Sequence, residues 1–111
     1  GLARPMAGSL TELTLPTGER IRSADSAEGE AVAVVYPWEI TISREPHDDS
    51  AQNQISGPLE SVSEIGGRVR VRLGPLTAEL TRESTERLGL ARGEIVYASF
   101  KATATRLVSG S

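Results

Sequence analysis

The feature that most constrains the fold is a segment of strict alternation that follows a glycine pair. Gly66 and Gly67 precede Arg68–Leu73, in which arginines alternate with aliphatic residues. A period of two places the arginines on one face of a β-strand and the aliphatic side chains on the other. Two consecutive glycines supply the positive φ angles of a tight hairpin turn. The segment therefore predicts a hairpin with one buried face.

A second alternating segment, residues 94–108, lies near the C-terminus. One face collects small or apolar side chains, namely Val96, Ala98, Phe100, Ala102 and Ala104. The other face carries hydroxyl groups around one cation, Lys101. The pattern predicts a half-buried strand in which a lysine among short polar side chains can meet an anion. Taken alone, Lys101 fits a solvated strand residue better than a ligand.

Turn-forming residues divide most of the remaining chain into short strand-like segments. The pattern predicts a first hairpin over residues 9–22, strands at 31–36 and 39–43, a long strand at 55–65 interrupted at Gly57-Pro58, and a strand at 76–80. Residues 44–53 are polar and form the best candidate for a linker. An all-β fold follows from this succession of short strands.

One segment departs from the strand period. Thr81 precedes a seven-residue stretch that contains Glu83 and Ser84, and Gly89 follows it. This predicts one or two helical turns with Thr81 as the N-cap and Gly89 as the stop. The hydroxyls of Thr81 and Ser84, with the backbone N–H groups of the first turn, could cradle an oxyanion. An ordinary N-cap is the alternative, and spacing alone favours it.

The two halves of the chain also resemble each other. Residues 7–10 correspond to 56–59 with an offset of 49, and residues 28–32 correspond to 92–96 with an offset of 64. The difference is an insertion in the second copy that includes the predicted helix. Where the second copy has Lys101, the first has Pro37. We interpret the pattern as a degenerate repeat of a small β-unit, with chance or common hairpin chemistry as the alternative.

Composition limits the classes of function. A net charge of −3 argues against a general nucleic-acid or acidic-membrane binder, which needs a basic surface. The absence of cysteine excludes disulfides and thiolate metal sites and favours a reducing cytosol. No apolar run reaches the ~20 residues of a membrane helix, and no secretion signal is visible. We expect one soluble domain with a small core.

Catalytic and phosphate-binding motifs are missing from the sequence. The single histidine, His47, lies beside Asp48 and Asp49 in the polar linker, where a solvated side chain is a simpler interpretation than a metal ligand. The arginines of 68–73 lack interleaved aromatic residues, so a solvated hairpin face is favoured over an oligonucleotide site. We predict that the chain is not an enzyme and carries no metal.

Together these residues resemble the molybdate-binding Mop domain, which is also classed among the TOBE domains. The matching elements lie in residues 50–108: Ser50-Ala-Gln-Asn53 before Ile55-Ser-Gly57, Ala78-Glu-Leu-Thr81 with Ser84, Leu88-Gly-Leu90, Gly93 and Phe100-Lys-Ala102. Upstream, Gly29-Glu-x-Val32 and Tyr36-Pro-Trp-Glu-Ile40 look like the preceding half of the C-terminal accessory region of ABC importer ATPase subunits. The resemblance covers almost the whole chain.

The resemblance implies an all-β fold of OB-like β-barrels of the Mop/TOBE type, in a degenerate two-copy arrangement with one short helix. It divides the chain into a first, incomplete TOBE-like half (residues 1–46), a Mop-like OB barrel (47–108) and a flexible tail (109–111), together one structural unit.

Carried over from the Mop family, the oxyanion-binding residues are Ser50, Ala51, Gln52, Thr81, Ser84, Lys101 and Ala102. A tetrahedral dianion needs convergent N–H and O–H donors together with positive charge, and these residue types provide both. Gln52 departs from the family, which typically carries arginine there. The departure removes one charge and a bidentate donor, and it leaves Lys101 as the principal cation.

The resemblance implies a regulatory accessory domain of an ABC importer ATPase subunit that binds molybdate or tungstate at a subunit interface. The alternative is a structural dimerisation domain of an importer for another solute, with no oxyanion bound. Either reading implies self-association, a fused ATPase domain and a membrane permease as partners, no cofactor and no nucleic acid. The expected location is the cytoplasm, at the inner face of the membrane.

Overall fold

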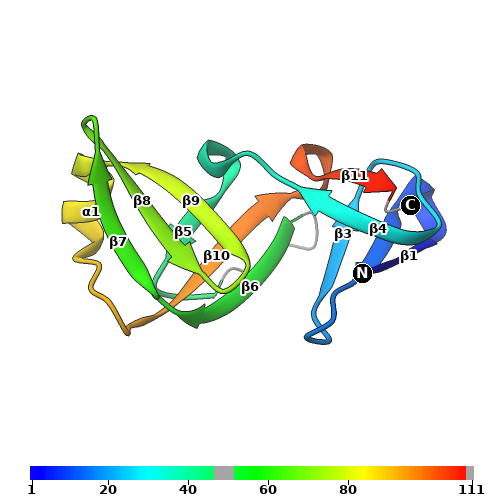
Figure 1. Ribbon diagram of the computed structural model, residues 1–111, viewed down its shortest axis with the longest axis horizontal. Helices are drawn as coiled ribbons and strands as arrows, with labels where there is room; N and C mark the ends of the chain where they lie inside the picture. Colours follow the sequence, from blue (N-terminus) through cyan, green and yellow to red (C-terminus); the bar gives the residue numbers. More distant parts are fainter. Residues whose placement is uncertain (47–51, 110–111) are drawn as a thin grey trace. The chain divides into compact units, whose positions relative to one another are not determined.

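The computed structural model describes residues 1–46 and 52–109 (Figure 1). Within them the chain forms eleven strands, three short 3-10 helices and one α-helix. The strands are β1 Leu2–Pro5, β2 Thr11–Thr14, β3 Arg20–Ser23, β4 Gly29–Val34, β5 Thr41–Ser43, β6 Gln52–Pro58, β7 Ser61–Ile65, β8 Arg68–Leu73, β9 Leu76–Thr81, β10 Ile95–Lys101 and β11 Arg106–Ser109; the helices are η1 Ala7–Ser9, η2 Pro37–Glu39, α1 Arg82–Leu88 and η3 Ala102–Ala104. The prediction of a β fold with one short helix is confirmed.

The described strands form three sheets. One has the order β11-β4-β1-β2-β3, a second β5-β10-β6 and a third β7-β8-β9. The first sheet places β11 beside β4, so the red end of the ribbon lies next to the cyan strand (Figure 1). Segments far apart in the sequence are therefore neighbours in the sheet.

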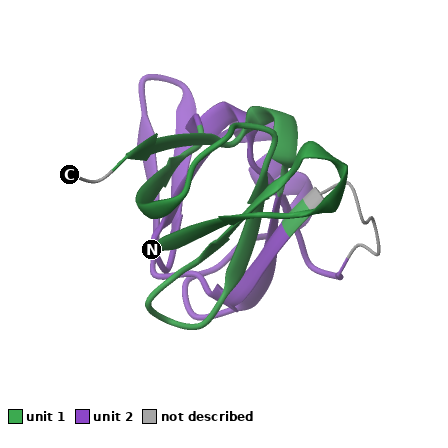
Figure 2. Cartoon of the chain, turned by 90° about the vertical axis from the view of Figure 1, so that its right-hand side faces the viewer, with its two compact units in different colours: residues 1–35, 49–53, 100–111 green, residues 36–48, 54–99 purple. Residues whose placement is uncertain are grey.

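The chain divides into two compact units that interleave along the sequence (Figure 2). Unit 1 comprises residues 1–35, 49–53 and 100–111, and unit 2 comprises residues 36–48 and 54–99. The unit boundary falls inside β6 and again inside β10. The predicted domain limits at residues 46 and 108 remain a prediction. Ser109 ends β11 and pairs with Ala31, and residues 110 and 111 lie outside the described part.

Unit 1 is built on the five-stranded sheet. The predicted first hairpin is present, because β2 pairs with β3 in antiparallel register from Thr11↔Ser23 to Thr14↔Arg20. One cluster of its core is aliphatic: Ala3, Leu13 and Ala31 are buried, and Leu15, Ala27, Ala33 and Leu107 pack against them. Four of these seven residues are alanine, so the cluster buries little apolar surface for each residue.

Unit 2 contains the hairpin that the glycine pair predicted. Gly66 and Gly67 have φ angles of 56° and 82°, and β8 alternates between exposed arginines and buried aliphatic residues. On its other side β8 pairs with β9 from Arg68↔Thr81 to Leu73↔Leu76. The third sheet therefore has the predicted apolar face and arginine-bearing face.

Two predicted long strands are broken in the structure. The segment 94–108 forms β10, the 3-10 helix η3 and β11 in place of one strand. The break occurs because the backbone of Ala102 turns: its carbonyl accepts hydrogen bonds from Ala24 N at 3.1 Å and Thr105 N at 3.2 Å. The segment 55–65 forms β6 and β7; its interruption was predicted at Gly57-Pro58, and the break follows Pro58 at Leu59, which is 1% exposed.

The repeat inferred from the sequence has a structural counterpart. Both copies contain a strand, a 3-10 helix and a second strand, β4-η2-β5 and β10-η3-β11. The last strand of each copy pairs with the first strand of the other copy: β11 pairs with β4, and β5 pairs with β10. The registers match at the offset of 64: Ala33 lies opposite Leu107, and Tyr97 lies opposite Ser43. The two copies therefore share one pairing scheme.

Candidate functional site

Thr81 and Ser84 form a hydroxyl-bearing corner where β9 ends and α1 begins. Thr81 has extended backbone angles and caps the helix, its Oγ1 accepting from Ser84 N at 3.1 Å. The same Thr81 hydroxyl donates to Ser84 Oγ at 2.9 Å. Ser84 Oγ is thus the acceptor in this pair. The predicted N-cap is confirmed, and it orients both hydroxyls.

The short helix is fixed at its other end by a residue that the sequence analysis placed in a linker. Gly89 ends α1 in the left-handed region, as predicted, with a φ angle of 61°. Arg44 then donates to the carbonyl oxygens of Leu88 and Gly89 at 2.6 and 2.7 Å, and its guanidinium pairs with Glu94 at 2.7 Å. A cation at the C-terminal carbonyls stabilises a helix. Arg44 therefore helps to hold the corner in place.

Arg68 is a cation that was predicted to lie on the solvated face of the hairpin. It lies directly opposite Thr81 in the β8–β9 pair, where cross-strand Cβ atoms lie about 5 Å apart. Its guanidinium reaches Glu79 at 4.0 Å, while Arg70 approaches the same carboxylate at 3.6 Å. Glu79 is thus shared by two arginines, and the β8–β9 face next to Thr81 is positively charged. The strand register identifies Arg68 as a neighbour of Thr81. The sequence pattern alone does not give this register.

Lys101 and Ala102 lie at the junction of β10 and η3. Lys101 is exposed, and its carbonyl accepts a hydrogen bond from Thr105 Oγ1 at 2.9 Å. Thr105 is 1 % exposed, and its own carbonyl accepts from the hydroxyl of Ser23. The backbone under Lys101 is therefore held by buried hydrogen bonds, while its ammonium group faces solvent.

The remaining predicted residues are only partly described. Ser50 and Ala51 lie outside the described residues, as do His47, Asp48 and Asp49, and Gln52 is described by its backbone as the first residue of β6. The adjoining Asn53 has a structural role. Its amide accepts from Arg22 N at 2.7 Å and donates to Arg22 O at 2.8 Å. This side chain thereby satisfies the backbone of the edge strand β3.

The predicted residues that can be followed form two pairs. Thr81 and Ser84 are hydrogen-bonded to each other in unit 2, and Lys101 and Ala102 are consecutive in unit 1. Each pair has a fixed backbone and presents polar groups to solvent. The prediction that both pairs serve one oxyanion site stays a prediction.

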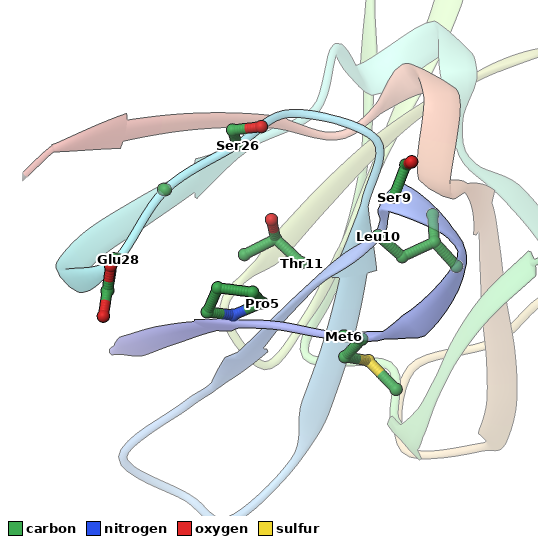
Figure 3. A pocket seen from close by; sticks show the side chains of 8 residues that line it. Pro5, Met6, Ser9, Leu10, Thr11, Ser26 and Glu28 are labelled. Atoms are coloured by element: carbon green, nitrogen blue, oxygen red, sulfur yellow. The ribbon is translucent and has the colours of Figure 1, made fainter.

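A hollow in unit 1 lies apart from the predicted residues (Figure 3). Its volume is about 440 Å³, and it is lined by Pro5, Met6, Ser9, Leu10, Thr11, Ser26, Ala27 and Glu28. The lining contains three hydroxyls and one carboxylate but neither lysine nor arginine. A carboxylate repels a dianion, so this hollow is poorly suited to an oxyanion.

The described part of the chain lacks two features, a cluster of metal-binding side chains and a membrane-spanning helix. Residues 1–46 and 52–109 contain no group of three histidine, cysteine, aspartate or glutamate side chains placed to hold a metal ion. No helix in those residues is long and apolar enough to cross a membrane.

The fold is similar to that of a solved binding protein. The cytoplasmic molybdate-binding protein ModG, in a form with molybdate bound, matches with a TM-score of 0.80 and 21% sequence identity, over 91% of this chain and 84% of that chain. The OB-like fold predicted from the sequence is thereby confirmed, which places the chain in a class of small β-barrel proteins. At this level of identity the likeness concerns the fold alone.

The family follows from the sequence match. The family model of the TOBE domain matches residues 49–107, more than half of the chain. This chain belongs to the TOBE domain family.

Two curated relatives are archaeal ATP-binding proteins. The molybdate/tungstate import ATP-binding protein WtpC of Pyrococcus abyssi is 37% identical over 94 residues, which is 81% of this chain and 27% of the relative. The protein of the same name from Pyrococcus horikoshii is 36% identical over 89 residues, or 77% of this chain and 26% of the relative. The chain thus spans about a quarter of the length of the curated relatives it matches.

Proposed function

We propose that this chain is an accessory domain of an ABC importer's ATP-binding subunit and that it binds molybdate or tungstate where two subunits meet. The observation that carries the proposal is the ordered Thr81–Ser84 corner in a chain 37% identical to a molybdate/tungstate import ATP-binding protein. In this proposal the domain does not catalyse a reaction, and ATP hydrolysis belongs to a separate domain of the subunit.

The proposed ligand is a tetrahedral dianion held by hydroxyl, backbone and cationic groups. Ser84 would donate through its hydroxyl, which the hydrogen bond from Thr81 holds in place, and Lys101 would supply the main positive charge. Backbone N–H groups would come from the segment Ser50, Ala51 and Gln52 and from Ala102. Such donors and charge must converge, because a dianion that loses water needs each hydrogen bond replaced. Arg68, opposite Thr81, would add charge near the corner.

Self-association is part of the proposal. Mop domains commonly hold their oxyanion at a subunit interface, and the proposed site would likewise be completed between copies of the chain. The membrane permease and the fused ATPase domain would be the other partners, with the domain at the cytoplasmic face of the membrane. Bound oxyanion at such an interface would stabilise one arrangement of the subunits over others.

The test is calorimetric titration of the chain with molybdate, tungstate and sulfate. We expect molybdate or tungstate to bind more tightly than sulfate, and Lys101→Gln to weaken binding by about tenfold or more, since it removes the main cation. Arg92→Gln, an exposed cation in the turn before β10, is the matched control and should leave binding unchanged. A lack of heat with any of the three anions would refute the oxyanion site.

A gain-of-affinity variant tests the role of Gln52. Restoring the arginine typical of the family, Gln52→Arg, should tighten oxyanion binding by about tenfold, because it adds one charge and a bidentate donor. Gln52→Lys adds the charge without the fork and should give a smaller gain. Equal gains would show that charge alone limits the affinity.

Gln52 also favours a second function. In this second function a TOBE domain without the arginine is a structural dimerisation module for an importer of another solute, with no oxyanion bound. That function requires ligand-independent association. Sedimentation of the chain without and with molybdate separates the two, because a sensor changes its assembly or its stability with ligand and a structural module does not.

A further inference from the structure

The sheet of unit 1 has an apolar outer face. Leu2 of β1, Val32 and Val34 of β4 and Val108 of β11 are 60%, 56%, 43% and 56% exposed. They share one face, because Val32 lies opposite Val108, Leu2 lies opposite Glu30, and alternate residues of a strand point the same way. We call these four side chains, together with Glu30 and Arg106, the outer face.

The other side of the same strands already has a core. Ala31 and Ala33 alternate with the valines of β4 and belong to the alanine-rich cluster of unit 1. The strand β4 therefore carries aliphatic side chains on both sides, whereas a sheet with one solvated face normally alternates apolar with polar residues. A row of exposed β-branched residues is typical of a surface that packs against another one.

The second copy shows how the equivalent strand face is used when it is covered. At the offset of 64, Val32 and Val34 correspond to Val96 and Ala98, which are both 0% exposed. Arg106 corresponds to Ile42, which is 5% exposed. The covered face belongs to unit 2, which also contains the sheet β7-β8-β9. The first copy retains the apolar strand face but lacks the insertion that includes β9.

The charges of the outer face point to a particular occupant. Glu30 lies beside Leu2 at one end of the apolar row, and Arg106 lies beside Val34 at the other. A two-fold axis that lies in the plane of the interface, passes between Val32 and Val108 and runs across the strands places the glutamate of each copy against the arginine of the other. Beyond the outer face, on the same side of the sheet, Arg4 pairs with Glu12 at 3.0 Å, and Arg20 and Arg22 lie on β3. The pattern is thus self-complementary, as an isologous interface requires.

We propose that the outer face is where a second copy of this chain packs, with the four aliphatic side chains at the centre and reciprocal Glu30–Arg106 pairs at the ends. The inference deepens the self-association that belongs to the proposed function by assigning it a surface. It does not depend on the oxyanion site, because it is tested without ligand.

The first experiment measures sedimentation of the full chain over a range of concentrations, without molybdate or tungstate. Val32→Glu buries a charge at the centre of the proposed interface and should weaken association by about a hundredfold. Ile65→Glu is the matched control, since Ile65 of β7 is also 56% exposed and lies in unit 2. Equal weakening by both variants, or a parent chain that stays monomeric, would overturn the proposal.

The second experiment tests the reciprocal pairing. Glu30→Arg alone places two arginines against each other at both ends, and Arg106→Glu alone places two glutamates together, so each variant should self-associate about tenfold more weakly. A mixture of the two variants restores opposite charges at both ends and should form the mixed dimer with nearly the parent affinity. A mixture as weak as either variant alone would overturn the two-fold arrangement. Circular dichroism of each variant shows whether it remains folded.

Discussion

The two copies of the repeat share a pairing scheme and differ in what is attached to it. Each contributes a strand, a 3-10 helix and a strand, paired in the same register at an offset of 64. The second copy adds the inserted segment with β9 and α1, and with it Thr81 and Ser84. It also has Lys101 where the first copy has Pro37. The strand framework is therefore common to both copies, while the proposed ligand groups are particular to the second.

The copies also differ in how they bury equivalent positions. Phe100 is 2% exposed, whereas its counterpart Tyr36 is 51% exposed and stacks on Trp38 with ring centroids 4.7 Å apart. The same place in the repeat is thus a core residue in one copy and a surface residue in the other. A repeat detected in sequence does not imply equal packing.

The largest expected effect concerns this aromatic position. Phe100→Ala should destabilise the chain by about 3–5 kcal/mol, since it removes a buried aromatic side chain and leaves a cavity. Tyr36→Ala should cost less than about 1 kcal/mol, because its ring is half exposed. Urea denaturation followed by circular dichroism measures both. Similar losses would mean that the two copies are packed alike at this position.

A smaller effect, equal in the two copies, is expected at the equivalent glycines Gly29, which begins β4, and Gly93, which comes shortly before β10. Gly29 and Gly93 have φ angles of 85° and 91°, in the region that costs other residues about 1–2 kcal/mol. Gly29→Ala and Gly93→Ala should each lower the unfolding free energy by that amount. Gly57→Ala is a control without a positive φ angle. Unequal losses would contradict the shared backbone geometry.

The helix cap gives a still smaller effect that exists in the second copy alone. Thr81→Ala removes the acceptor for Ser84 N and should cost about 1 kcal/mol. Thr77→Ala, on the same face of β9 but away from the cap, should cost less. Thermal unfolding measures stability, and titration with molybdate measures whether the proposed site loses affinity in parallel. A stable Thr81→Ala variant with unchanged affinity would argue against both roles of this residue.

The smallest effect is expected when the first copy is given the lysine of the second. Pro37 begins η2, so Pro37→Lys should change stability by less than about 1 kcal/mol. It should add no oxyanion site, because the first copy has no counterpart of Thr81 and Ser84. Calorimetry with tungstate checks this, and a new binding event would show that the lysine alone is sufficient.

The sequence pattern predicted the parts of the fold that depend on neighbouring residues. The hairpin at Gly66-Gly67 and the helix from Thr81 to Gly89 follow from turn and cap chemistry, and both are present. The break at Ala102 was missed because one of the two hydrogen bonds to its carbonyl comes from Ala24, which is remote in sequence. The exchange of β5 and β11 was missed for the same reason, since alternation does not identify a strand's partner.

In the candidate site, too, the features set by neighbouring residues could be predicted and those set by remote residues could not. The N-cap geometry of Thr81 and Ser84 could be predicted because it involves residues three apart. Arg68 and Arg44 were not assigned because one is brought near Thr81 by strand register and the other reaches the end of α1 from a segment 44 residues away. Cross-strand register and long-range capping are properties of the folded chain.

The exchange of final strands has a consequence for the order of folding. Unit 1 includes β1 to β4, yet its edge strand β11 comprises residues 106–109. During synthesis the first strands leave the ribosome long before that edge can form, and β4 is left with an open edge in the interval. Pairing between such distant segments slows folding and exposes intermediates to aggregation. We therefore expect newly made chains to mature only after residue 109 has emerged, and chains truncated before β11 to depend on chaperones.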